Sequence, residues 1–131
     1  MTAIPSLDTY PRPLSEREAE ILHFVLGVDD ARLAPLREQA ASAVVTGRCT
    51  CGCATVNLAV DRQRTRPVSL CSPVVSAHTR EVEGQPVFGL LLFLDEGWLS
   101  LLEIWWIDKP PAEFPAATAF VSPRFECDEA G

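Results

Sequence analysis

Two apolar runs separated by a short polar turn dominate the chain between residues 87 and 107. The first run, VFGLLLFL, spans 87–94, and the second, WLSLLEIWWI, spans 98–107. A strand with one solvent-facing side alternates apolar and polar residues, because successive side chains point to opposite faces. These runs do not alternate. The pattern therefore predicts a β-hairpin at the centre of the fold, with both of its faces covered.

The turn Asp95-Glu96-Gly97 predicts the register of this hairpin. A three-residue loop is typical of a type I turn followed by a G1 bulge, with the glycine in the left-handed conformation. That register places Leu94 opposite Trp98 and Gly89 opposite Glu103. We expect the helices to cover one face, and the C-terminal segment, a second subunit or another protein to cover the other. The second strand then divides into two faces: Leu99, Leu101, Glu103, Trp105 and Ile107, and Trp98, Ser100, Leu102, Ile104 and Trp106.

Helix signals are confined to the first third of the chain. Ser15 and Glu18 match a capping box at the start of a helix over 16–26, and Gly27 is placed to end it. A proline suits the first position of a second helix over 35–43, because its missing N–H would have no partner there.

The rest of the chain reads as strands and irregular segments. Besides the hairpin, β-branched residues and alternation predict strands at 44–46, 55–60, 68–70 and 78–83, the last an exposed edge strand. The 131 residues are expected to form one domain, 1–131. Residues 1–14 form an extended lead-in, and the prolines after Asp108 make 110–131 an irregular C-terminal wrap. The predicted fold class is α+β: two N-terminal helices packed on an antiparallel sheet of about four to six strands around the hairpin 87–107.

Charge argues against two classes of partner. The chain carries 18 acidic and 11 basic residues, a net charge of −7, whereas binding to phosphate-rich surfaces needs a clustered positive field. We therefore expect neither nucleic acid nor membrane as a partner. Arg62, Arg64 and Arg66, with Arg80 nearby in sequence, form the one basic island, which is either a solvated loop or a docking patch for an acidic partner.

The expected location is cytoplasmic. The first 18 residues lack the basic and apolar regions of a secretory signal, and both apolar runs are too short to span a bilayer. Five cysteines, three of them within five residues, argue against the disulfide framework of a secreted protein.

Those three cysteines, Cys49, Cys51 and Cys53, form the motif CTCGC. In extended chain they project from one face, and Gly52 allows the chain to curl so that the sulfurs converge. A tetrahedral zinc site with Cys71, Cys127, His23 or His78 as fourth ligand is one interpretation. The alternatives are a Cys-x-Cys redox couple and a turn whose small side chains pack inward.

Glu103 is the one ionisable residue inside the apolar runs. A buried carboxylate could serve as a general acid or base in a pocket, with room provided by Gly89. The alternative is a position from which Glu103 reaches solvent or an arginine such as Arg48 or Arg80. No second carboxylate, phosphate loop or nucleophile motif accompanies Glu103.

The stretches GRCTCGCATVNLAV, GLLLFLDEGWLSLLEIWW and PPAEFP resemble a group of small uncharacterised proteins from high-GC bacteria. The resemblance covers roughly residues 15–115. It implies no activity, cofactor or catalytic residue.

The leading functional prediction is a small, non-catalytic protein-binding module, of the immunity or antitoxin kind, with Trp98, Trp105 and Trp106 as contact residues. Its partner is another protein or a second copy of the chain. The alternatives are a zinc-stabilised module using Cys49, Cys51 and Cys53, and a small enzyme with Glu103 as its acid or base.

Overall fold

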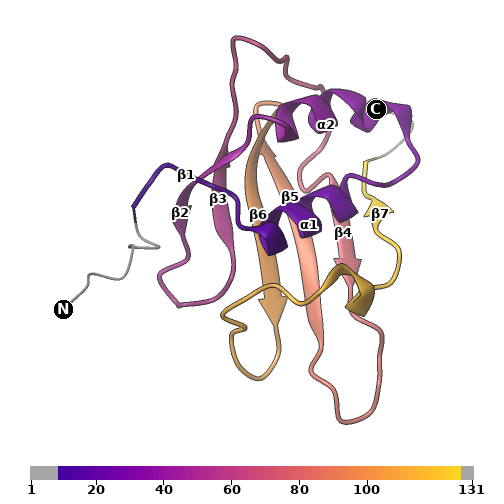
Figure 1. Ribbon diagram of the computed structural model, residues 1–131. Coiled ribbons are helices and arrows are strands. Elements are labelled where there is room, and N and C mark those ends of the chain that lie inside the picture. Colours follow the sequence, from indigo (N-terminus) through magenta and orange to yellow (C-terminus); the bar gives the residue numbers. More distant parts are fainter. Residues whose placement is uncertain (1–8, 128–131) are drawn as a thin grey trace, which may run out of the picture.

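The computed structural model describes residues 9–127. Within this range seven strands form one antiparallel sheet in the order β1-β2-β3-β6-β5-β4-β7, with two helices on one side (Figure 1). The strands are β1 (Arg12–Pro13), β2 (Val44–Arg48), β3 (Val56–Ala59), β4 (Val75–His78), β5 (Phe88–Asp95), β6 (Trp98–Trp106) and β7 (Arg124–Phe125). The α+β class and the central β5–β6 hairpin are confirmed. The two-residue strands β1 and β7 bring the number above the expected four to six.

The helix α1 (Glu16–Val25) begins at the predicted capping box. The Glu18 amide donates to Ser15 Oγ at 3.1 Å, and the Ser15 amide donates to Glu18 Oε1 at 2.8 Å. Arg12, on β1, adds two hydrogen bonds to the same carboxylate, at 2.8 and 2.9 Å. The carboxylate therefore joins the start of the helix to the edge of the sheet.

The second helix is shorter than expected. A single 3-10 turn, η1 (Ala31–Leu33), leads into α2 (Ala34–Ala40), with Pro35 in its first turn as predicted. The Asp30 carboxylate caps η1 by accepting from the Arg32 amide at 2.9 Å. Both helices pack on the face of the sheet where the apolar side chains of β5 and β6 are buried.

The core lies between this face and the helices. It includes Leu90, Leu92, Leu102 and Ile104 from the hairpin, Ile21, Leu22 and Val25 from α1, and Leu36 from α2. The C-terminal segment packs on the same side, where the ring of Phe120 lies 6.1 Å from that of Phe24 and Phe114 is buried. Within residues 9–127 the C-terminal segment therefore does not cover the second face of the hairpin, and covering by a second subunit or another protein stays a prediction. Here Leu91, Phe93 and Leu101 are half-buried and Trp105 is exposed.

The hairpin register differs from the predicted one. The turn is the two residues Glu96 and Gly97, with φ of 50° and 85°, as in a type I′ turn. Asp95 pairs with Trp98, and Leu94 pairs with Leu99 rather than with Trp98. A bulge next to this pair leaves one extra residue on β6, so Leu99 turns to the buried face instead of sharing a face with Leu101.

The same shift changes the neighbour of Gly89. Trp105, not Glu103, lies opposite this glycine, and Glu103 lies opposite Leu91. A Cβ at Gly89 would lie 1.8 Å from Cε2 of Trp105. The room at Gly89 is therefore occupied by an indole ring and is no pocket for the Glu103 carboxylate.

Three strand predictions also need correction. Residues 68–70 are not a strand, and no strand runs over 79–83, where Thr79 forms an isolated bridge with Phe120. Strand β4 ends at His78, where the predicted edge strand begins, and it lies inside the sheet between β5 and β7. The wrap is not wholly irregular, because β7 begins directly after Pro123, where no ladder hydrogen bond from the proline is needed. Residues 1–8 of the lead-in and 128–131 of the wrap lie outside the described residues.

Candidate metal centre

The CTCGC motif forms the loop of the β2–β3 hairpin. The two strands pair as far as Arg48 and Val56, and the Cys49 amide donates to the Thr55 carbonyl at 3.1 Å. The chain then turns back on itself, with the Gly52 amide donating to the Cys49 carbonyl at 3.3 Å. Gly52 has a φ of +90°, a conformation that favours glycine.

The three sulfur atoms converge, as the spacing predicts. The Sγ atoms of Cys49, Cys51 and Cys53 all lie within 4.8 Å of one another, and those of Cys49 and Cys51 are 3.0 Å apart. The Cys53 amide donates to Cys51 Sγ at 3.4 Å. Cys53 is buried, Cys49 is half-buried and Cys51 is exposed, so the cluster opens to solvent on one side.

The environment of the loop favours ionisation of one thiol. Burial raises the pKa of Cys53, but hydrogen bonds from the side chain and backbone of Thr55 and from the two neighbouring thiols outweigh it, so the net shift is downward. Hydrogen bonds to Cys49 and Cys53 raise the pKa of Cys51 to about 11. The Cys53 thiol therefore ionises more readily than the Cys51 thiol.

Thr55 also ties the cluster to the centre of the sheet. Its Oγ1 accepts from the Ile104 amide at 3.0 Å and donates to the Ile104 carbonyl at 3.4 Å. Both residues are buried. Because Ile104 lies on β6, the end of the cysteine loop is held by the best-packed strand of the fold.

None of the predicted fourth ligands joins the group within residues 9–127. Cys71 and Cys127 form a disulfide with each other, 56 residues apart in sequence. This bond is not among the features that the sequence predicts. His78 lies on β4, with its Nδ1 3.0 Å from the Thr79 carbonyl oxygen, and His23 lines a separate cavity between α1 and α2. The sequence could not exclude Cys71 and Cys127 as ligands, because the pairing of distant cysteines depends on how the C-terminal segment returns to the sheet.

Glu103 stands on the face of β6 that carries no helix, and it is half-buried. Neither predicted arginine partner is paired with it. The Arg80 guanidinium donates to the Thr118 carbonyl, and Arg48 Nη2 lies 3.4 Å from the carbonyl oxygens of Cys53 and Ala112. An acid–base role for Glu103 stays a prediction.

The three tryptophans do not share one face. Trp106 lies opposite Phe88, on the face of the hairpin that the helices cover. Trp105 lies on the uncovered face and is 37% exposed. Trp98 lies beneath the guanidinium of Arg62, whose Cζ is 5.0 Å from its ring. The protein partner expected for these residues stays a prediction.

The basic island is partly used inside the molecule. Besides the contact of Arg62 with Trp98, Arg64 forms an exposed ion pair with Asp61 at 3.6 Å. The Arg66 carbonyl accepts from the Gln39 side chain at 2.8 Å. A docking role for the island also stays a prediction.

No protein-family model, curated protein or solved structure matches this chain. Among the helices of residues 9–127, none has the length and apolar content needed to cross a bilayer.

Proposed function

We propose that this domain binds a soft divalent metal ion, Zn²⁺ in the first place, through the thiolates of Cys49, Cys51 and Cys53. The observation that carries the proposal is the convergence of three sulfur atoms within 4.8 Å in a loop of five residues. Thiolates are the protein ligands that soft ions prefer, and Zn²⁺ accepts three or four of them.

The sulfur positions suit such an ion. Sulfurs bound to a tetrahedral Zn²⁺ at about 2.3 Å lie about 3.8 Å from one another. The distance between the Cys49 and Cys51 sulfurs is 3.0 Å, and no pair exceeds 4.8 Å. Small rotations of the side chains are therefore enough to close the group around a cation.

Three protein ligands leave one position of a tetrahedral ion open. Structural zinc sites are closed by a fourth protein ligand, whereas sites with three ligands bind water or another molecule in the remaining position. The core of this domain is built mainly from apolar side chains of the helices and the sheet, with Ala54 as its member beside the loop. The ion therefore stabilises the loop, not the whole fold, and stays accessible to an incoming ligand.

Cys71 and Cys127 form a disulfide, and such bonds persist in oxidising surroundings. The cytoplasmic location expected from the sequence belongs with this proposal as a further prediction. In that compartment the Cys71–Cys127 bond would be exposed to reduction.

Titration of the metal-free chain with Co²⁺, followed by displacement with Zn²⁺, tests the proposal. We expect one ion per chain, with the visible and ultraviolet absorption of tetrahedral thiolate coordination. Cys51→Ser removes an exposed ligand without disturbing the core. It should weaken binding about tenfold or more, since loss of groups that merely support a ligand already costs this much.

The double variant Cys71→Ser, Cys127→Ser is the matched control, because it removes two sulfurs from outside the cluster. It should bind the ion as tightly as the unaltered chain. Failure of the unaltered chain to bind one ion, or equal binding by Cys51→Ser, would overturn the proposal.

A further inference from the structure

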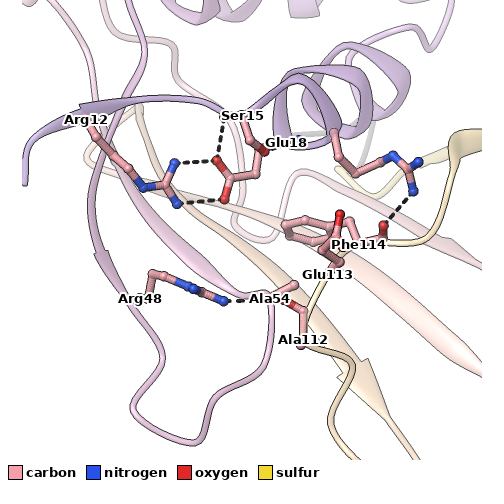
Figure 2. Close-up of a pocket in the computed structure, with 9 residues that line it drawn as sticks. Arg12, Ser15, Glu18, Arg48, Ala54, Ala112, Glu113 and Phe114 are labelled. Carbon is pink, nitrogen blue, oxygen red and sulfur yellow. Dashed lines mark hydrogen bonds and ion pairs between the residues drawn. The ribbon is translucent and has the colours of Figure 1, made fainter. Parts of the chain in front are cut away.

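A cavity of about 230 Å³ lies beside the cysteine loop, between the β2–β3 hairpin, the start of α1 and the C-terminal segment (Figure 2). Its charged wall includes Arg12, Arg17 and Arg48, and its apolar wall includes Ala54, Ala112 and Phe114. Arg48 and Ala54 flank the three cysteines in sequence, but the cavity itself contains no sulfur.

Two of the three guanidinium groups already have anionic partners. Arg12 forms two hydrogen bonds with the Glu18 carboxylate, and Arg17 lies 3.2 Å from Glu20 and donates to the Phe114 carbonyl at 2.9 Å. One donor in this wall remains unused, because Arg12 Nε is buried with no hydrogen-bond partner in residues 9–127.

Arg48 differs from the other two. Across residues 9–127 it has no carboxylate within ion-pair distance. Its only hydrogen bonds are two long contacts of 3.4 Å with carbonyl oxygens of Cys53 and Ala112. Arg48 is thus a half-buried guanidinium at the wall of the cavity that has no ion pair among residues 9–127, and a guanidinium is well suited to bind a carboxylate.

We propose that this cavity binds a small monocarboxylate with a short apolar body. The carboxylate accepts from the Arg48 guanidinium on the charged wall. The apolar part of the ligand lies against Ala54, Ala112 and Phe114. Figure 2 shows Arg12 and Arg48 on one side of the cavity and Phe114 on the other.

The balance of charge favours one negative charge over two. Arg12 is paired with Glu18 and Arg17 with Glu20, so Arg48 is the guanidinium of the wall with no ion pair among residues 9–127, and Glu113 in the same wall opposes a second negative charge. A dianion such as phosphate would exceed the charge of Arg48 and would place its oxygens against apolar carbon. The inference stands apart from metal binding, because none of these groups is a sulfur ligand.

Titration of the full chain with phenylacetate, phenylacetamide and inorganic phosphate, read from the backbone amide NMR signals of Ala54, Ala112 and Phe114, tests the proposal. Phenylacetate should shift these signals saturably. Phenylacetamide has the same ring but no charge. Its affinity should be lower by a factor of about ten or more, because it lacks the charge-assisted hydrogen bond. This comparison uses the unaltered chain and needs no variant.

Arg48→Gln should weaken phenylacetate binding about tenfold or more. Arg64→Gln removes the same charge from an exposed loop and should leave binding unchanged. If Arg48→Gln does not fold, Arg48→Lys keeps the charge but loses the planar group and should bind with intermediate strength. Equal binding of acid and amide, stronger binding of phosphate, an unaffected Arg48→Gln, or no saturable shift would each overturn the proposal.

Discussion

Gln39 is a buried polar residue whose role cannot be read from its sequence neighbours. Its side chain is completely buried, yet each polar atom has a partner. Nε2 donates to the carbonyls of Arg66 and Gly97 at 2.8 and 3.0 Å, and Oε1 accepts from the Leu99 amide at 2.8 Å. One amide therefore joins α2 to both the hairpin turn and the loop before β4.

Replacing Gln39 with leucine should destabilise the protein by about 2–3 kcal/mol, because the Leu99 amide is left buried without an acceptor. Urea unfolding of the variant and of the unaltered chain measures the difference. Gln63→Leu, at an exposed position, should change stability by less than about 0.5 kcal/mol. An equally small loss for Gln39→Leu would show that the amide bonds are not stabilising.

At the scale of an element, the start of α1 shows how a cap becomes part of the tertiary structure. The sequence predicts the reciprocal bonds of Ser15 and Glu18, and the structure adds Arg12 from β1 as a third member. Burial raises the pKa of Glu18, but the hydrogen bonds from Arg12 and Ser15 outweigh it, so the carboxyl pKa lies below its usual value of 4.5.

This shift predicts the direction of a pH dependence. A carboxyl whose pKa is lower in the folded state stabilises the fold above its unfolded pKa, and this contribution is lost as the pH falls from about 4.5 through the folded pKa. Glu18→Gln keeps a capping-box residue but cannot titrate. Its urea midpoint should fall less than that of the unaltered chain between about pH 6 and about pH 3.

Glu16→Gln is the control for that comparison, because it alters an exposed glutamate in the same helical turn. It should retain the pH dependence of the unaltered chain. A Glu18→Gln variant with the same loss at low pH as the unaltered chain would contradict the prediction.

At the scale of the whole molecule, the C-terminal segment is held in two ways. It packs on α1 through Phe114 and Phe120, and it returns to the sheet as β7 beside β4. The Cys71–Cys127 disulfide lies next to this pair, where the Glu126 amide also donates to the Val74 carbonyl at 2.9 Å.

Removing this disulfide in the double variant Cys71→Ser, Cys127→Ser should destabilise the fold by about 4 kcal/mol. This is the loop-closure value for residues 56 apart. Urea unfolding in the absence of reductant measures the loss, and treatment of the unaltered chain with reductant should reproduce it. A variant as stable as the oxidised chain would show that the pairing of β4 with β7 suffices without the bond.

Local patterns predict the features of this protein that depend on near neighbours in sequence. The capping box, the proline in α2, the two apolar strands and the convergence of the CTCGC sulfurs each depend on residues within a few positions of one another. The helical period, the strand period and the reach of a short loop are properties of the backbone. The α+β class could therefore be derived before the structure, whereas convergence of Cys49, Cys51 and Cys53 on a metal ion is one of three interpretations that the sequence leaves open.

The tertiary structure decided what depends on distant residues. Four features depend on how segments far apart in the chain are placed. They are the hairpin register with its two-residue turn and the bulge that moves Leu99 to the buried face, the uncovered side of the hairpin, the pairing of Cys71 with Cys127, and the cavity at Arg48. A shift of one residue in register moves side chains to the opposite face, and several registers satisfy the same apolar pattern. Packing against the helices and the C-terminal segment selects one of them, and this selection also places Arg48 where an anion can reach it.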